Sequence, residues 1–233
     1  MSLTCVSCFF PVKAKHPSYY NWFANTLAVN CPYVFFTNRE TVEIIKIFRK
    51  ELPTYYILYE LEDLYMYRYK DRLLANPDHC PSVEVSIIWN EKIILMEKAS
   101  TINPFNSEWF KWMDAGMSIY RLNKPPPYPF PLEDRLAHLP KDKFIYSLSD
   151  PFIPHLITET NYYHHVSGTF LLHKSIIPMF AVIYKLYAEK LFHGQNIWTE
   201  QVVLTHIFKD HPQLFYKLGD GYGIVSQYLY GTI

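Results

Sequence analysis

Short apolar runs alternate with helical patterns over the first sixty residues. The runs at Leu3–Val12, Pro32–Phe36 and Pro53–Glu60 have the length and the aromatic and β-branched content of buried strands. Between them, Pro17–Val29 and Arg39–Lys50 carry apolar residues at helical spacing. This β-α-β-α-β order predicts an α/β protein whose parallel sheet is covered by helices.

A second helical region follows the third strand. The patterns predict a helix at Leu61–Leu74, a polar loop at Asn76–Pro81 and a long helix at Val83–Ile102. Lys92 lies within the apolar stripe of the long helix. A lysine on an apolar face either extends to water or reaches a site at the edge of the sheet.

The segment after the long helix places an acid beside a buried strand. Asn103–Pro104 ends the helix, because proline lacks the N–H that a helix interior requires. The apolar and aromatic run Glu108–Met113 predicts a strand, Asp114 follows it, and Gly116 lets the backbone turn away. Ligands of α/β sheets bind at the carboxyl ends of strands, so Asp114 is a candidate site residue. The alternative is that Asp114 caps a turn.

The second half of the chain predicts two further strands, at Lys143–Leu148 and Tyr163–His173. Gly168 interrupts the latter, which indicates a bulge or the close approach of a ligand to the backbone. Helices are expected at Ser175–Phe192, stopped by Gly194, and from the cap Thr199 through Ile207, with a turn at Gly219–Gly223.

The stretch Lys124–Pro131 is rich in proline and predicts an extended, polyproline-like segment. A stiff surface loop over a cleft is the favoured interpretation, and a ligand motif for a signalling partner is the alternative. There is no internal repeat and no long linker, so we expect a single domain over residues 1–233.

Composition narrows the function classes. Lys plus Arg and Asp plus Glu both number 22, and zero net charge argues against a dominant surface for nucleic acid or anionic membranes. No transmembrane helix is expected, since Lys185 breaks the longest apolar run at Ile176–Tyr184. No basic segment precedes the apolar amino-terminal stretch, so a secretory signal is not expected either.

The cysteines bear on the cellular compartment. Cys5 and Cys8 have the spacing of a metal or redox pair, but residues three apart on a strand point to opposite faces. No second pair exists to complete a zinc site. We therefore expect buried free thiols in a protein of the reducing cytoplasm.

Six short motifs follow one another along the chain: Pro32-Tyr-Val-Phe-Phe-Thr37, Trp89-Asn-Glu-Lys92, Asn103-Pro-Phe105, Trp112-Met-Asp-Ala-Gly116, Val166-Ser-Gly-Thr-Phe170 and Trp198-Thr-Glu-Gln-Val-Val203. As an ordered set they resemble the HtrL/YibB family (also called the WlaTC/HtrL type), which is associated with bacterial surface-polysaccharide loci. That family is similar in turn to GT-A glycosyltransferases. The resemblance implies a GT-A-like, Rossmann-like fold with a mixed, mostly parallel sheet and helices on both faces.

The resemblance also implies a metal. GT-A enzymes hold Mn²⁺ or Mg²⁺ against the donor diphosphate with an Asp-x-Asp element after a central strand. Asp114 matches the first acid, whereas position 116 is glycine. Either another residue completes the metal site, or cations such as Lys92 take over part of the metal's role. The candidates for a late metal ligand are His206, His211 and Asp220.

Donor-site residues follow from the same likeness. Lys92 and Arg49 would contact the diphosphate through charge-assisted hydrogen bonds. Phe9, Phe10 and Thr37, at the ends of the first two strands, would lie beside the base and ribose. The alternatives are an exposed helix end for Arg49 and core packing for the two phenylalanines.

The acceptor side would involve Gly168 and Glu200. Gly168 resembles the glycine-containing strand that lines the acceptor side in GT-A enzymes. Glu200, which opens a helix facing the same region, is a candidate general base for the acceptor hydroxyl in an inverting reaction. The alternative is the ordinary preference for an acid in the first turn of a helix. His164 and His165 are adjacent on an expected strand and are not interpreted as a metal pair.

The expected function is transfer of a sugar from a nucleoside diphosphate sugar to a glycan or other acceptor hydroxyl, in the synthesis of surface polysaccharide or glycoconjugate. A non-catalytic nucleotide-sugar or carbohydrate-binding protein of the same fold is the alternative that Gly116 favours. A scaffold protein that uses its prolines as a partner ligand is a third class. No Gly-x-Ser-x-Gly elbow, P-loop or Gly-x-Gly-x-x-Gly motif is present.

Overall fold

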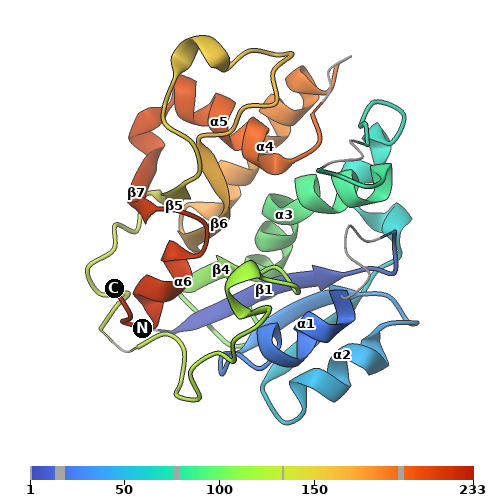
Figure 1. Ribbon diagram of the computed structural model, residues 1–233, viewed down its shortest axis with the longest axis vertical. Helices are drawn as coiled ribbons and strands as arrows, with labels where there is room; N and C mark the ends of the chain where they lie inside the picture. Colours follow the sequence, from blue (N-terminus) through green and yellow to red (C-terminus); the bar gives the residue numbers. More distant parts are fainter. Residues whose placement is uncertain (1, 14–18, 76–78, 133, 194–196) are drawn as a thin grey trace.

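The computed structural model describes residues 2–13, 19–75, 79–132, 134–193 and 197–233. Within these ranges seven strands form one sheet in the order β3-β2-β1-β4-β6-β5-β7 (Figure 1). β6 runs against its neighbours β4 and β5, and every other pairing is parallel. The strands are β1 (Leu3–Phe9), β2 (Tyr33–Thr37), β3 (Thr54–Leu58), β4 (Trp109–Trp112), β5 (Phe144–Leu148), β6 (Val166–His173) and β7 (Phe215–Asp220).

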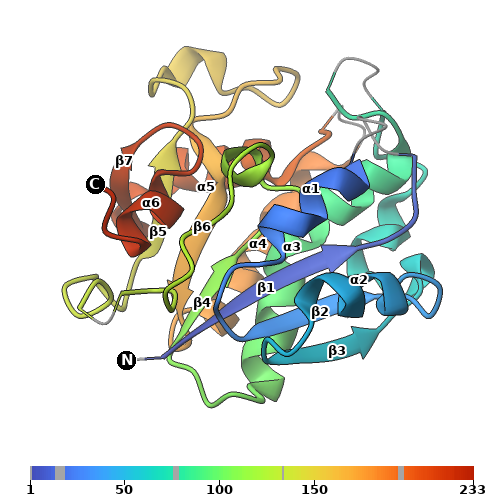
Figure 2. The same cartoon turned by 60° about the horizontal axis from the view of Figure 1, so that its bottom comes forward.

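Helices cover both faces of this sheet (Figures 1 and 2). One face packs against α3, α4 and α5, and the other against α1, α2 and α6. The α/β class with a mixed, mostly parallel sheet and two covered faces is therefore confirmed. The helices are α1 (Tyr19–Thr26), α2 (Val42–Arg49), α3 (Val83–Ile102), α4 (Ile177–Leu191), α5 (Glu200–Asp210) and α6 (Ile224–Leu229).

The period of two along β1 divides its side chains between the two cores. Cys5 packs in the core beneath α1 and α2, whereas Val6 and Cys8 pack in the core beneath α3. Both thiols are buried and free. The prediction that this cysteine pair points to opposite faces is confirmed, and the geometry does not suit a shared metal.

The long helix α3 has the bounds that the sequence predicts. The Ser82 side chain accepts the N–H of Val85 at the start, and Asn103 ends the helix with a positive φ of 40°. Most of the middle of the helix is buried, because it lies between the sheet and the helices α4 and α5. This central position carries Lys92 into the interior.

The region after β3 differs from the expected helix. It forms two short 3-10 helices, η1 (Leu61–Asp63) and η2 (Tyr65–Tyr69). The carboxylate of Glu91 on α3 accepts the backbone N–H groups of Tyr65 and Met66 at 2.9 and 2.7 Å. This tertiary contact anchors the start of η2 on α3, so local helical pattern does not decide the conformation here.

The carboxyl-terminal part of the described chain also differs. Residues expected as a flexible turn from Gly219 belong partly to β7, which pairs in parallel with β5, and the chain then forms α6. Pairing with β5 supplies the backbone partners that the local sequence does not reveal. The turn itself is confined to residues 221–223, where Gly221 and Gly223 have φ near 100°.

The proline-rich segment does not lie over the cleft described below. Phe130 is buried against Tyr230 of the segment after α6, with ring centroids 4.5 Å apart, and the Tyr128 hydroxyl donates to the Tyr230 carbonyl. The segment therefore packs on the α6 side of the sheet, where its apolar residues cover the core.

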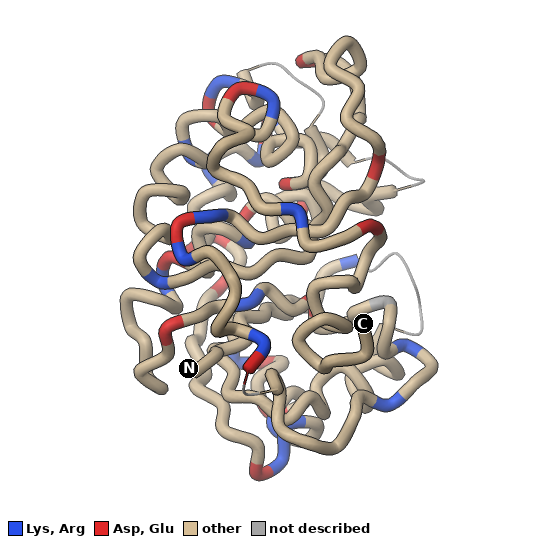
Figure 3. The backbone as a smooth tube through the Cα atoms, turned by 90° about the vertical axis from the view of Figure 1, so that its left-hand side faces the viewer, with Lys and Arg blue, Asp and Glu red and all other residues tan. Residues whose placement is uncertain are grey.

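Three local expectations lie wholly or partly outside the described residues: the start of α1 at Pro17 or Ser18, the middle of the loop Asn76–Pro81, and Gly194. Basic and acidic residues are interspersed along the side of the molecule shown in Figure 3. Among the described helices, none combines the length and apolar character needed to cross a bilayer.

Candidate functional site

A cavity of about 430 Å³ lies where β1 and β4 end, between α3 and the start of α5. Four residues singled out by the sequence line it together: Lys92, Asp114, Gly168 and Glu200. They come from one helix, the segment after β4, strand β6 and the start of α5. The remaining lining residues are Tyr19, His79, Trp89, Gly116, Arg121, Tyr162, Thr199, Gln201 and Tyr222.

Local structure fixes the direction of the two acids. Asp114 follows β4 by two residues and so lies at the carboxyl edge of the sheet. Glu200 is the first residue of α5, and the Thr199 hydroxyl before it accepts the N–H of Gln201 as the predicted cap. The same hydroxyl lies 2.7 Å from Oε2 of Glu200 and donates to it. The cap therefore starts the helix and also orients its first carboxylate.

Lys92 joins these two acids. Its Nζ lies 2.7 Å from Oε1 of Glu200 and 3.1 Å from Oδ1 of Asp114, and only 5% of the residue is exposed. Burial disfavours the ammonium, but the two carboxylates outweigh it and raise the pKa of Lys92. The lysine of the apolar stripe thus reaches a site at the sheet edge and stays charged there.

Asp114 is held by three donors. The indole Nε1 of Trp112 donates to Oδ1 at 2.7 Å, the Tyr222 hydroxyl donates to Oδ2, and Lys92 completes the set. Burial opposes ionisation, yet the ammonium and these hydrogen bonds lower the pKa of Asp114. Its carboxylate is therefore a permanent negative charge at neutral pH.

The pKa of Glu200 is shifted in the opposite direction. It is 1% exposed, and burial is the largest influence that raises its pKa; Lys92 opposes the shift, while the charge of Asp114 adds to it. Two carboxyl groups in one cavity thus have pKa values moved in opposite directions. Such a pair provides one fixed charge and one group able to exchange a proton, which general acid–base chemistry requires.

An apolar slot of about 90 Å³ adjoins the cavity and shares Tyr19 and Trp89 with it. Phe9 and Phe10, at and just after the end of β1, line this slot, and their place beside a base stays a prediction. Thr37 does not reach either space. It is fully buried, and its hydroxyl lies 2.6 Å from that of Thr41, so its role is at the start of α2.

The prediction that Arg49 contacts a diphosphate is wrong in this structure. Arg49 is 0% exposed at the amino ends of β2 and β3, away from the cavity. Its guanidinium donates to the carbonyls of Leu27, Val29 and Cys31 at 2.7–3.0 Å and packs on the Tyr33 ring. It also donates to the Thr54 hydroxyl and the Pro53 carbonyl, so the guanidinium ties the loop after α1 to the start of β3.

The residues at Asp114 do not suit a divalent metal. Among the described residues there is no group of three or more His, Cys, Asp or Glu side chains arranged to hold one. Position 116 offers no side chain, and Glu200 faces the ammonium of Lys92. Mn²⁺ and Mg²⁺ prefer several oxygen ligands, whereas the carboxylates here are already engaged.

The candidate late ligands lie elsewhere. His206 faces a loop carbonyl at 3.3 Å, His211 packs on the ring of Tyr187, and Asp220 pairs with Lys217 at 3.0 Å. None of these three candidates is among the residues that line the cavity.

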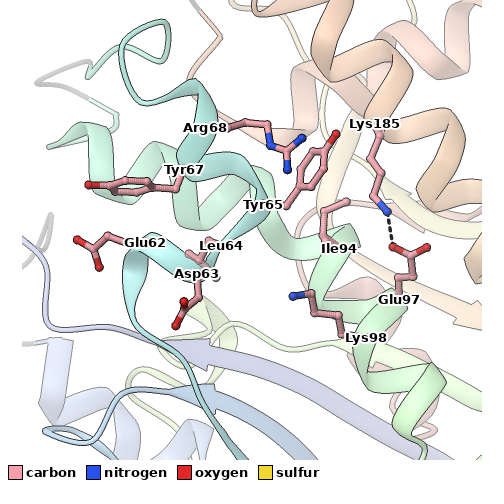
Figure 4. A pocket seen from close by; sticks show the side chains of 10 residues that line it. All are labelled: Glu62, Asp63, Leu64, Tyr65, Tyr67, Arg68, Ile94, Glu97, Lys98 and Lys185. Atoms are coloured by element: carbon pink, nitrogen blue, oxygen red, sulfur yellow. Dashed lines mark hydrogen bonds and ion pairs between the residues drawn. The ribbon is translucent and has the colours of Figure 1, made fainter.

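A second cavity, of about 520 Å³, lies between η2, α3 and α4 (Figure 4). Its cations already have partners. Lys185 pairs with Glu97 at 2.6 Å, Lys98 donates to the Tyr59 hydroxyl at 2.6 Å, and the guanidinium of Arg68 stacks on Tyr65. It contains neither the paired acids nor the strand ends of the first cavity, which we therefore take as the candidate site.

Among the polar lining residues that sequence reasoning missed, Tyr222 and Arg121 have the clearest contacts. Tyr222 donates to Asp114, and two glycines with positive φ flank it, which is the one local signal of a placed side chain. Arg121 lines the cavity, where its guanidinium lies 3.8 Å from the ring centroid of Trp22 and donates to the Gly116 carbonyl. No spacing in the sequence connects Arg121 to the strand ends.

Known proteins offer distant likenesses. No curated protein matches the chain. Two crystal structures of the glycosyltransferase GlyE from Streptococcus pneumoniae TIGR4 are similar, at 9% identity with a TM-score of 0.43 and, for the apo form, 11% with 0.45. The similarity covers 93% and 94% of this chain but only 45% of each of those chains. A bacterial family of unknown function, HtrL_YibB, matches residues 60–224. The resemblance noted in the motifs is thereby confirmed, and the chain belongs to the HtrL_YibB family.

Proposed function

We propose that this protein is a glycosyltransferase that moves a sugar from a nucleoside diphosphate sugar to a hydroxyl of a glycan or other acceptor. One observation carries the proposal. A buried ammonium joins two carboxylates with opposite pKa shifts, inside a cavity at the carboxyl edge of a mostly parallel sheet. This edge is where α/β sheets bind nucleotides.

The donor is assigned to the slot and the adjacent cavity. The base enters the apolar slot beside Phe9 and Phe10, and the diphosphate lies at Lys92. As the bond between the sugar and the diphosphate breaks, its electron pair goes to the phosphate oxygen. The ammonium stabilises that developing charge, which is the main electrostatic task in this reaction.

The acceptor is assigned to the side of Gly168 and Glu200. Its hydroxyl oxygen forms the new bond to the anomeric carbon and transfers its proton to Glu200. A carboxyl whose pKa is raised is a stronger base than an ordinary one and remains available near neutral pH. Asp114, which keeps its charge, holds Lys92 in position through the whole cycle.

A non-catalytic protein that binds nucleotide sugars or carbohydrates is the second candidate. Gly116 favours it, because the second acid that would complete a metal site is absent. The convergence of Lys92, Asp114 and Glu200 favours turnover, since a binding protein has no need of a proton-exchanging carboxyl beside the diphosphate.

For the biological setting we propose surface-polysaccharide or glycoconjugate synthesis in the cytoplasm. The four cysteines are free and buried, which suits a reducing compartment.

The test is turnover of a panel of nucleotide sugars. Release of nucleoside diphosphate, by hydrolysis or by transfer to mono- and oligosaccharide acceptors, is followed with and without Mn²⁺. Release with at least one donor is the expected result. Saturable nucleotide binding without any release would favour the second candidate, and absence of both would exclude the proposal.

A further inference from the structure

We infer that Lys92 supplies the positive charge that a divalent metal supplies in comparable reactions, so that this site binds and uses a nucleoside diphosphate without a metal ion. The inference rests on the proposed function. It concerns which cation faces the diphosphate, and it is carried by the contacts of three residues: Lys92, Asp114 and Glu200.

Each carboxylate oxygen already has a hydrogen bond or an ion-pair contact. Oδ1 of Asp114 accepts from Trp112 and lies 3.1 Å from Nζ of Lys92, and Oδ2 accepts from Tyr222. Oε2 of Glu200 accepts from a threonine hydroxyl, and Oε1 faces the same ammonium at 2.7 Å. A hard cation that takes about six oxygen ligands would have to displace several of these donors.

The positive charge of Lys92 also disfavours a divalent metal at Asp114. A metal bound to Oδ1 of Asp114 at about 2.1 Å would lie within about 5 Å of the ammonium of Lys92. The two cations would then repel each other in a buried setting, where screening by water is weak. The ammonium already lies between the two carboxylates, which is the place that a bridging metal would take.

Lys92 still has capacity for a ligand. An ammonium has three N–H donors, and its ion pairs with the two acids engage at most two of them. Because Lys92 lines the cavity, the third can meet a phosphate oxygen there. Arg121 adds a second cation to the same lining.

If Lys92 takes the place of a metal ion, the variant Lys92→Ala should bind one. In Lys92→Ala the two carboxylates face each other without a cation. A divalent ion that the parent protein excludes should then find a site. Metal independence should therefore change into metal dependence when one lysine is removed.

The experiment uses ADP, GDP, UDP and CDP as probes, with binding measured by calorimetry in EDTA and in MnCl₂. Direct Mn²⁺ binding is measured by electron paramagnetic resonance without nucleotide. The parent protein should bind its preferred nucleotide within twofold in the two buffers and should bind no Mn²⁺. Lys92→Ala in EDTA should bind at least tenfold more weakly, the scale of a hydrogen bond to a charged group. It should gain both Mn²⁺ binding and partial recovery of nucleotide affinity in MnCl₂.

The matched control is Lys98→Ala. Lys98 lies on the same helix, but it donates to Tyr59 and lines the second cavity. Its removal should leave nucleotide affinity unchanged, and an equal loss in both variants would overturn the assignment to Lys92. If Lys92→Ala does not fold, nucleotide binding by the parent protein in EDTA and in MnCl₂ tests the inference. Nucleotide binding by the parent only with Mn²⁺ would overturn the inference and leave the proposed function standing. Absence of binding in both buffers would remove the proposed function itself.

Discussion

A Cβ atom on Gly168 would lie 2.6 Å from Oε1 of Glu200, closer than a Cβ atom approaches other heavy atoms in proteins. It would also lie 3.3 Å from Nζ of Lys92. The pairing of β5 with β6 shifts register between Phe170 and Val166, so a bulge or other irregularity lies beside Gly168. The glycine keeps open the space in which the ion pair forms.

Gly168→Ala should therefore separate Glu200 from Lys92 while adding only one methyl group. Overpacking of this kind costs about 1–3 kcal/mol in the free energy of unfolding. Sugar-nucleotide turnover should fall at least tenfold, because a small misplacement of the reacting groups has large effects on rate. Thermal unfolding and initial rates measure the two effects. An alanine variant with normal rates would show that the spacing between residue 168 and Glu200 is unimportant.

Asp114→Asn should remain folded and lose at least a hundredfold in turnover, since the fixed charge that orients Lys92 disappears. The sequence alone suggests almost no loss of stability for an acid at a sheet edge. The three donors to Asp114 change that expectation to about 1–3 kcal/mol, the scale for hydrogen bonds to a charged group. Circular dichroism and donor hydrolysis are the measurements. Asp142→Asn, at an exposed acid, is the control and should change neither.

The ionisation of Glu200 should set the acidic limb of the pH–rate profile. The proposed base works only when deprotonated, and burial raises its pKa above 4.5. The rate should therefore fall as the pH decreases through that raised value, so the limb lies at higher pH than for an ordinary glutamate. In Glu200→Gln this limb should vanish together with most of the transfer. A limb that persists in the glutamine variant would assign the base to another residue.

Arg49 should affect the stability of the fold and not the affinity for nucleotide. Because its buried guanidinium donates to three carbonyls, Arg49→Ala should destabilise the fold by about 1–3 kcal/mol for each carbonyl left without a donor. Nucleotide affinity of the fraction that remains folded should be unchanged, since Arg49 is absent from the cavity lining. Denaturant unfolding and calorimetry at low temperature measure these quantities. A selective loss of affinity with normal stability would restore Arg49 to the diphosphate site.

Local pattern was enough for much of the fold because periodicity and caps are local properties. The bounds of α3 follow from Ser82 and Asn103, and the alternation in β1 predicts the opposite orientations of Cys5 and Cys8. The failures have distant causes. Glu91 on α3 holds the segment that becomes η2, and β7 depends on pairing with β5.

The site shows the same division. Lys92 and Asp114 were found because each departs from its own local pattern, one within an apolar stripe and the other after a buried strand. Arg49 and Thr37 lie on the expected elements, but burial decides their roles, and burial depends on neighbours far along the chain. Tyr222 is separated from Asp114 by 108 positions, and nothing near either residue indicates the contact.

That separation has a consequence for the order in which the protein matures. Lys92 and Asp114 leave the ribosome more than a hundred residues before Tyr222, so the carboxylate lacks one of its donors while the rest is being made. Tyr222 follows β7 in the chain, and β7 pairs with the distant strand β5, a kind of pairing that forms slowly. A nascent chain that ends before residue 215 would contain Lys92, Asp114 and Glu200 but neither Tyr222 nor β7. Ligand affinity should therefore appear late in biogenesis, after most of the sheet has formed, and it can serve as a readout of completed folding.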